Sequence, residues 1–304
     1  MGEVQNLHIR YKEQKDFALH DINLNVEEGE LFGMIGPDGA GKTSFFRILA
    51  TLLLPTSGRA SVMGLEVVKD IYAIRRKLGY MPGRFSLYQD LSVEENLNFF
   101  ATLFETTVEE NYDLVKDIYI QLEPFKKRKA GQLSGGMKQK LALCCALIHK
   151  PELLLLDEPT TGVDTVSRKE FWDMLGKLKK TGLTILVSTP YMDEASRCDR
   201  VALIQNGKIL SVDTPKGIID SFPYPLFQIK SKEMAKLHKD MIESKLLHSA
   251  HIFGEWNHLV FNDGNTMEQL IDYLSLKGHT NIVWKEIAAG IEDCFIERMG
   301  ELKN

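Results

Sequence analysis

The chain has 304 residues, of which 44% are hydrophobic and 26% charged, so we expect a globular protein, not a disordered, collagen-like or disulfide-stapled one. At about 100 to 200 residues per domain, this length allows two domains with separate cores. The 37 basic and 42 acidic residues give a net charge of −5, which excludes a strong general attraction to nucleic acid or an anionic membrane. Any phosphate-binding site must therefore be local.

Membrane and compartment signals are weak throughout the sequence. Four cysteines are too few and too scattered for a disulfide framework, which fits a reducing cytosol. The N-terminus lacks a basic start followed by an apolar stretch, so we expect no secretory signal. The longest apolar runs, 141–148 and 153–156, are far shorter than the ~20 residues that span a bilayer. If a membrane is involved, we expect another chain to cross it.

In chain order, residues 6–35 alternate and turn as β structure does, and they end in an apolar run that predicts a buried strand. Residues 36–43 then fit the pattern G-x-x-x-x-G-K-[ST], and apolar positions from Phe45 to Leu53 fall on one face of a predicted helix. Strand, glycine loop and helix thus follow one another in the order that phosphate binding requires.

This loop predicts a nucleotide site. Its glycines let backbone N–H groups curl around phosphates, Lys42 can reach the β and γ oxygens, and the Thr43 hydroxyl can bind Mg²⁺. A functionless glycine-rich turn does not explain the flanking strand and helix. The predicted ATP-binding residues of the loop are Gly36, Pro37, Asp38, Gly39, Ala40, Gly41, Lys42, Thr43 and Ser44.

Two further motifs complete the predicted site. The apolar strand 153–156 ends in Asp157 and Glu158, which can serve Mg²⁺ and the attacking water, respectively, although alone such a run is more typical of a strand with a solvated end. Ser134, Gly135 and Gly136 directly precede a helix and form a second anion site. Two phosphate-binding surfaces on one chain suggest a nucleotide held between two chains.

From about residue 6 to residue 212 the sequence resembles the ATP-binding subunits of ABC transporters. The likeness is strongest to the bacterial export class that includes drug-resistance ATPases, and it includes segments 87–97 and 188–195 and a C-terminal domain ending in 291–296. The resemblance implies that ATP and Mg²⁺ are cofactors and that the signature 134–136 caps the γ-phosphate bound by a partner subunit. It also implies that Tyr11 stacks on adenine and that Asp164 lies in a dimer-contact loop.

Three positions depart from the family pattern. Gly83 stands where the family has a glutamine that contacts Mg²⁺ and the attacking water, and Pro190 stands where it has a histidine that binds the γ-phosphate. Asp38, a milder departure, replaces an asparagine and adds negative charge near the phosphates. A structural interpretation of Pro190 makes Thr189 a helix N-cap and Pro190 the first helical residue.

The patterns and the resemblance together predict an α/β fold. Residues 1–220 are expected to form a P-loop NTPase core of the ABC type, a mixed sheet with an N-terminal antiparallel portion and an inserted helical subdomain at about 84–150. Residues 221–304 are expected to form a small α+β domain. Its predicted order of strand, helix, two strands, helix, strand and closing helix matches a split βαβ, ferredoxin-like unit.

The expected function is the ATP-binding subunit of an exporter, placed in the cytoplasm at the inner face of the membrane, whose loop 83–90 contacts a separate permease. One hypothesis makes this chain's own ATP site slow while its signature completes a better equipped second ATPase, and a homodimer that hydrolyses ATP through Glu158 stays open. A nucleotide-sensing regulatory subunit and a soluble non-transport ABC ATPase are the alternatives. No nucleic-acid partner is expected, because no sustained heptads lie between Lys42 and Ser134.

Overall fold

The computed structural model describes residues 1–12 and 16–301. The chain divides into two units, one of Met1–Ile218 together with the end of the last helix from Glu297, and one of Ile219–Ile296. The predicted domain limits at 220 and 221 stay a prediction. In the described part of the chain, no helix is both long and apolar enough to cross a membrane.

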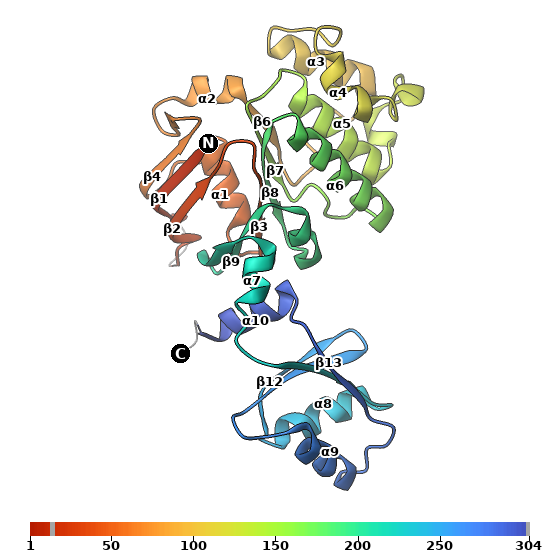
Figure 1. Cartoon of the computed structure of the whole chain (residues 1–304). Coiled ribbons are helices and arrows are strands. Elements are labelled where there is room, and N and C mark those ends of the chain that lie inside the picture. Colours follow the sequence, from red (N-terminus) through yellow and green to blue (C-terminus); the bar gives the residue numbers. More distant parts are fainter. Residues whose placement is uncertain (13–15, 302–304) are drawn as a thin grey trace. The chain divides into compact units, whose positions relative to one another are not determined.

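A six-stranded sheet in the order β10-β9-β3-β8-β7-β6 forms the centre of the first unit (Figure 1). All neighbours are parallel except the hairpin of β9 and β10. Every residue of β3, β7 and β8 is buried, as expected for parallel strands that are covered on both faces. The strands are β3 (Leu31–Ile35), β6 (Leu78–Met81), β7 (Leu153–Asp157), β8 (Thr184–Thr189), β9 (Arg200–Gln205) and β10 (Lys208–Asp213).

Helix α1 (Lys42–Leu49) lies between this sheet and a second, antiparallel sheet in the order β2-β1-β4-β5 (Figure 1). That sheet is the predicted antiparallel portion. Helix α1 ends four residues earlier than the apolar pattern predicts, and Leu52 is 55% exposed in the turn after it. The remaining elements here are β1 (Gly2–Ile9), β2 (Leu19–Val26), β4 (Ser57–Val62), β5 (Leu65–Glu66) and α2 (Ile71–Lys77).

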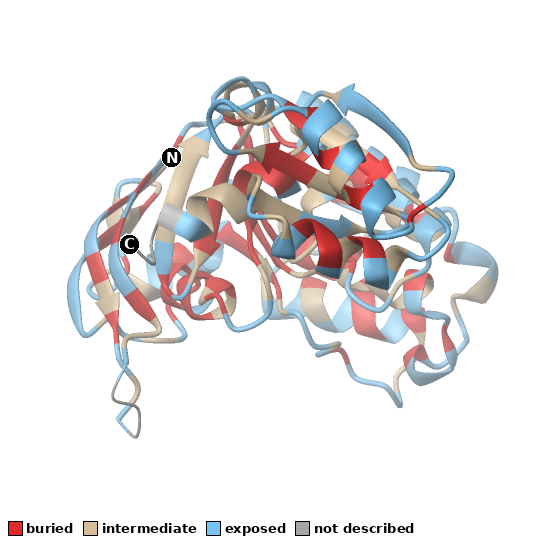
Figure 2. Ribbon diagram, turned by 90° about the horizontal axis from the view of Figure 1, so that it is seen from below, coloured by how far each residue is buried: buried red, intermediate tan, exposed pale blue. Residues whose placement is uncertain are grey.

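The segment between β6 and β7 is helical, and its helix α5 covers the sheet together with α6 (Figures 1 and 2). Helix α3 starts with the expected capping box, in which the Glu95 N–H donates to Ser92 Oγ at 3.2 Å and the Ser92 N–H donates to Glu95 Oε2 at 2.7 Å. The elements are α3 (Val93–Leu103), α4 (Tyr112–Tyr119), α5 (Gly135–Leu147), α6 (Thr165–Lys180) and the 3₁₀ helices η1 (Glu123–Phe125) and η2 (Ala130–Gln132).

The predicted hairpin between β9 and β10 is confirmed. Asn206 and Gly207 adopt φ values of 48° and 72°, the left-handed conformation that a tight two-residue turn between twisted strands requires. This turn also reaches the nucleotide loop, because the Gly207 N–H donates to the Ala40 carbonyl at 2.9 Å. A short 3₁₀ helix, η3 (Met192–Arg197), links β8 to β9, and α7 (Pro215–Asp220) follows β10.

The second unit has an antiparallel sheet in the order β12-β13-β11-β14, which is the strand order of a ferredoxin-like split βαβ and confirms that prediction. Helices α8 and α9 pack on the sheet around a core that includes Ile229, Leu237 and Leu270. The elements are β11 (Leu226–Lys230), α8 (Met234–Glu243), β12 (Leu247–Phe253), β13 (Trp256–Phe261), α9 (Met267–Leu276), β14 (Val283–Ile287) and α10 (Ile291–Glu301).

Candidate nucleotide-binding site

The loop between β3 and α1 has the backbone shape of an anion cradle. A side chain at Gly36 would bring a Cβ atom to 2.1 Å from the Ile204 carbonyl oxygen, so only glycine fits there. Gly41 adopts φ 109° as the N-cap of α1, which has no side-chain cap and no acidic residue in its first turn. The N–H groups at this helix start are therefore available to phosphate oxygens, which is the feature ATP requires.

Lys42 is turned back over this loop and is 3% exposed. Its Nζ donates to the carbonyl oxygens of Gly36 at 2.7 Å and Pro37 at 3.0 Å. The same ammonium lies 3.0 Å from Glu158 Oε1. The predicted phosphate-binding lysine and the predicted general base are thus in direct contact.

Asp157 ends β7 beside Thr43, as the motif spacing predicts. Its Oδ1 accepts hydrogen bonds from Ser188 Oγ at 2.7 Å and Thr43 Oγ1 at 3.3 Å. Burial raises the pKa of Asp157, and these two hydrogen bonds act in the opposite direction. A hydroxyl and a carboxylate are oxygen ligands that suit Mg²⁺, so the residues present fit the implied metal.

Glu158 follows directly and leaves the strand with φ 50°. Its backbone N–H donates to Ser188, to the carbonyl oxygen at 3.1 Å and to Oγ at 2.9 Å. The side chain is 21% exposed, which leaves room for a water molecule to approach it. Ser188 therefore orients both acidic residues, a role that the motifs did not predict because it arises from the register that pairs Ser188 with Asp157.

Two other predicted residues lie at the edge of the loop. The Tyr11 hydroxyl is 2.9 Å from Ser44 Oγ, so the tyrosine is held at the start of α1, and its stacking on adenine stays a prediction. Asp38 is exposed at the tip of the loop, next to exposed Gly39.

The signature and the loop predicted to contact a second chain lie side by side. Ser134 caps α5, since its Oγ accepts a hydrogen bond from the Met137 N–H at 3.3 Å, and it is exposed together with Gly135. Gly136 is buried so closely against α6 that a Cβ atom there would lie 2.7 Å from Ser167 Oγ. Asp164 caps α6 through its Oδ1, which accepts from the Val166 N–H at 3.1 Å and the Ser167 N–H at 3.0 Å.

The two departures from the family pattern lie at the same end of the sheet. Gly83 follows β6, and a Cβ atom there would lie 3.0 Å from the Asp157 carbonyl oxygen. The expected N-cap role of Thr189 is wrong, since Tyr191 is the N-cap of η3 and Pro190 precedes the helix. The Thr189 hydroxyl instead accepts from the Tyr191 N–H at 3.1 Å and donates to Glu194 Oε2 at 2.5 Å.

Glu194, which the motifs did not single out, ties three segments of the site together. It is 3% exposed, and its carboxylate also accepts from Thr160 Oγ1 at 3.0 Å. Arg168 of α6 lies 3.5 Å from Glu194 Oε1 and covers the Tyr191 ring at 4.2 Å from the centroid. The loops after β7 and β8 are thereby fixed to the helix that Asp164 caps.

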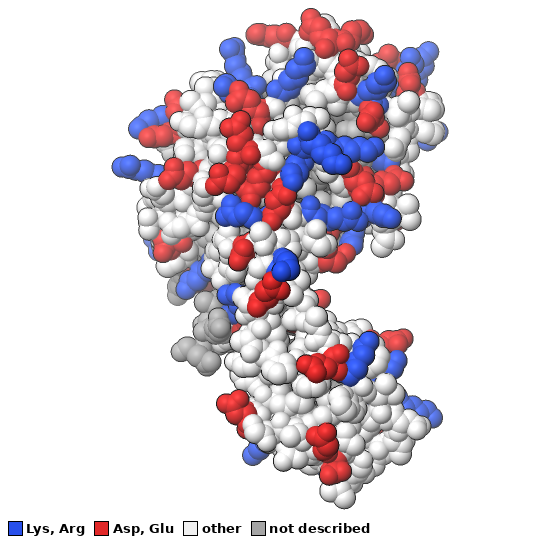
Figure 3. Space-filling view, viewed as in Figure 1, with Lys and Arg blue, Asp and Glu red and all other residues white. Residues whose placement is uncertain are grey.

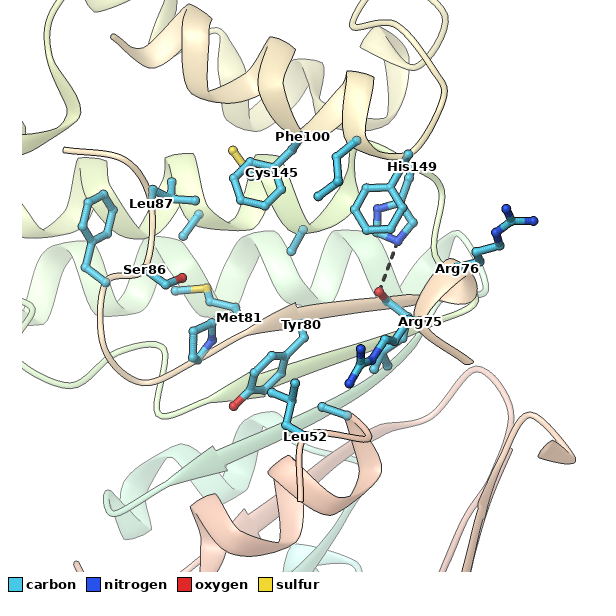
Figure 4. A pocket seen from close by; sticks show the side chains of 18 of the residues that line it. Leu52, Arg75, Arg76, Tyr80, Met81, Ser86, Leu87, Phe100, Cys145 and His149 are labelled. Atoms are coloured by element: carbon cyan, nitrogen blue, oxygen red, sulfur yellow. Dashed lines mark hydrogen bonds between the residues drawn. The ribbon is translucent and has the colours of Figure 1, made fainter. Parts of the chain in front are cut away.

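A groove of about 920 Å³ is lined in part by Pro82 and Arg84, the two neighbours of Gly83 in the chain (Figure 4). It is lined by α2, the end of β6, the loop that follows it, α3 and α5. Its walls are mostly apolar, with a stacked pair of Phe104 and His149 whose ring centroids are 3.8 Å apart. Three arginines, Arg75, Arg76 and Arg84, and no acidic residue contribute to the lining.

The glycine loop with Lys42 and the paired acids at the end of β7 define a P-loop nucleotide-binding protein, and the capped signature helix narrows the class to ATP-binding cassettes. The family model "ABC transporter" matches residues 19–161. The chain belongs to the ABC transporter family of ATP-binding proteins, as the sequence predicted. Similar relatives within this family are named for export.

Two relatives and one solved structure illustrate the similarity. The chain is 38% identical to the probable multidrug ABC transporter ATP-binding protein YbhF of Escherichia coli K12, with 93% of this chain and 49% of that protein covered. It is 33% identical to the Nod factor export ATP-binding protein I of Burkholderia lata, with 93% and 92% covered. The chain thus spans about half the length of the first relative and nearly all of the second.

Among solved structures, a dimeric ATP-binding cassette in a post-hydrolysis state with ADP and phosphate gives a TM-score of 0.64. It is 27% identical and covers 70% of this chain and 98% of its own. The predicted ABC-type core fold is therefore confirmed.

Proposed function

We propose that this chain is the ATP-hydrolysing subunit of an ABC exporter and works at the inner face of a membrane with a separate permease. The observation that carries the proposal is the contact between Lys42 and Glu158 at the uncapped start of α1, with Thr43 and Asp157 beside them. The names of the relatives, which refer to multidrug and Nod factor export, support the transport role.

The geometry suggests how these residues act on ATP. Lys42 exchanges its contacts with two loop carbonyls and Glu158 for the β and γ oxygens, and the N–H groups of the loop bind the remaining phosphate oxygens. Thr43 and Asp157 would hold Mg²⁺, which neutralises charge that develops on the phosphates. Glu158, released from the lysine, accepts a proton from the attacking water.

A second copy or a second ATPase is needed to close the site. Ser134 and Gly135 are exposed at the N-terminus of α5, where backbone N–H groups and the helix dipole attract the γ-phosphate held by another chain. Exposed Asp164 lies at the adjacent loop, where the two chains would meet. Because Gly83 and Pro190 offer no side-chain donor or acceptor, we propose that this chain's own site is slow and that its signature serves a better equipped partner. A homodimer that relies on Glu158 alone is the competing arrangement.

Hydrolysis of ATP by the purified chain, alone and with Glu158→Gln, tests the proposal. The glutamine variant should bind ATP and lose residual hydrolysis, because the amide cannot accept the proton. Glu152→Gln is a matched control at the other end of β7, where Glu152 is half-exposed and pairs with Lys77, and it should hydrolyse ATP as the parent does. Failure to bind ATP would contradict the function, whereas an ordinary transporter rate would contradict only the slow site.

The groove beside Gly83 is the proposed contact with the permease. Its apolar walls and three arginines complement an apolar segment that carries carboxylates. Leu103→Glu places a charge at a 61% exposed wall residue and should reduce co-purification with the permease at least about tenfold. Leu276→Glu, at a 90% exposed leucine of α9, should leave it unchanged. Equal losses in both variants would show that the groove is not the contact.

A further inference from the structure

The second unit contains a cavity of about 420 Å³ that the nucleotide chemistry does not use. It is lined by the strands β11, β13 and β14 and by the loop that leads into α9, all within residues 219–296. Four aromatic side chains share the lining: Tyr224, Phe227, Phe261 and Trp284. A volume of this size falls in the range of small-molecule sites, about 300 to 1,000 Å³.

The rings meet at steep angles and so form walls that face different directions. Phe227 lies in the middle, with its centroid 5.5 Å from that of Phe261 at an interplanar angle of 69°, and 6.2 Å from that of Trp284 at 63°. Tyr224 and Trp284 remain 38% and 42% exposed. Large aromatic side chains that keep this much exposure beside a cavity are available to contact a molecule that enters it.

The polar wall of the cavity is fixed before any ligand arrives. The Asn262 N–H and the Asn265 side-chain amide both donate to the Leu246 carbonyl, at 3.0 and 3.1 Å. The next residue, Thr266, forms a capping box with Gln269 at the start of α9. A preorganised wall lowers the cost of ordering the site on binding.

The charge of the lining has one sign. Among its thirteen residues are Asp263 and Glu268, and no lysine, arginine or histidine. A hydrogen bond with Thr266 is the main cause that lowers the pKa of Glu268. On the face seen in Figure 3, most of the surface of this unit carries no charged side chain.

We propose that this cavity binds an organic cation, an amine or quaternary ammonium that carries an apolar or aromatic body. The negative faces of aromatic rings attract a cation within about 6 Å of their centroids, and the ring walls cover the apolar body. Two carboxylates at the rim add attraction over a longer range, as far as salt permits. The same features disfavour nucleotides and other anions. The site is separate from ATP binding and gives the second unit a role in sensing a small molecule.

Saturation-transfer NMR on the full chain can compare phenyltrimethylammonium with tert-butylbenzene, which has the same shape without the charge. The cation should bind at least about fivefold more tightly than the neutral compound, because both compounds pack against the rings but only the cation is attracted electrostatically to the ring faces and the carboxylates. Trp284→Ala should weaken binding of the cation by about 3- to 30-fold. Asp263→Asn should weaken it about two- to fivefold at low salt and less at 0.15 M salt.

Trp256→Ala is the matched control. Trp256 is the other tryptophan of this unit, lies outside the cavity lining and has Lys230 Nζ 4.4 Å from its ring centroid. This variant should bind phenyltrimethylammonium as the parent does. Three results would each overturn the proposal: the neutral compound binds as tightly as the cation, Trp256→Ala weakens binding of the cation as much as Trp284→Ala does, or the cation does not bind at concentrations on the order of 10 mM. All variants should still bind ATP, so failure here is distinguishable from failure of the proposed function.

Discussion

Asp157 lies between the ends of both neighbouring strands. The Ser188 hydroxyl of β8 donates to its carboxylate, and a Cβ atom at Gly83, after β6, would lie 3.0 Å from its carbonyl oxygen. The two positions that depart from the family pattern therefore differ in how easily each can accept a new side chain. A side chain at Gly83 would require the Asp157 carbonyl to move by a few tenths of an ångström, whereas Pro190 lies in a loop after β8 that precedes η3. Position 190 is therefore the cleaner place to restore a missing contact.

Pro190→His should raise the ATP hydrolysis rate of the chain's own site by at least about tenfold. The imidazole supplies a donor where the γ-phosphate is expected, and single preorganised contacts of this kind commonly change rates by about 10² to 10³. The measurement is phosphate release under saturating ATP. Pro190→Ala, which removes the ring without adding a donor, serves as control, and equal rates for the two variants would argue that position 190 does not face the phosphate.

The residues of the site differ in how far sequence could predict them. Lys42, Thr43, Asp157 and Glu158 come together as expected because the loop and the strand end each carry their own local pattern. Ser188 was not predicted to orient the acids, since that role depends on the register between β7 and β8, which no single segment encodes. A serine opposite a motif aspartate in a neighbouring predicted strand is the signal that could have identified it.

At the scale of elements, Asp164 has a structural role besides the dimer contact that the resemblance implies for it. It caps α6, and hydrogen bonds from the backbone N–H and the side chain of Ser167 are the main cause of its lowered pKa. Asp164→Ala should therefore lower the melting temperature of the chain by a few degrees. Asp164→Ser should preserve it, because serine caps well. If both variants melt at the temperature of the parent, the cap contributes nothing to stability. Any loss of ATP-driven dimerisation then reports on the contact between chains alone.

Glu194 also acts between elements: it is a positioning residue that joins the loops after β7 and β8 to α6. Glu194→Ala leaves the buried hydroxyls of Thr160 and Thr189 without their carboxylate acceptor and removes one of the two acidic partners of Arg168. The substitution should cost about 2 to 4 kcal/mol in the free energy of unfolding. Urea denaturation gives this value. Asp193→Ala, which removes a 69% exposed partner of the same arginine, should cost less than about 1 kcal/mol.

Variants of Glu194 also separate a role in positioning the loops from a role in general stability. Glu194→Gln keeps the size and the acceptor oxygen of the side chain, so it should recover part of the lost stability. If the Glu194 network positions the loop that carries Pro190, Glu194→Ala should lower the hydrolysis rate at saturating ATP more than it raises the KM for ATP. A cost for Glu194→Ala no larger than that for Asp193→Ala would refute the buried network.

At the scale of the whole molecule, the order of helices and strands was largely predictable from the sequence. The contacts that the ends of these elements make in the folded chain were not. The ferredoxin-like order of the second unit followed from alternating strand and helix patterns, and the Asn206-Gly207 turn from its own φ requirement. The end of α1 was missed because Leu52 and Leu53 continue the apolar period without continuing the helix. Leu52 instead lines the groove proposed for the permease.

The two units have cores that share no residue, which predicts that they can lose structure separately. Leu270→Ala, at a fully buried position of α9, should destabilise the second unit by about 2 to 5 kcal/mol. Amide hydrogen exchange should then accelerate in β11, β13 and α9 and stay unchanged in β7. Leu155→Ala, at a fully buried position of β7, should give the opposite pattern. Acceleration throughout the chain in both variants would show that the units unfold together, and ligand binding to either unit would then stabilise the other.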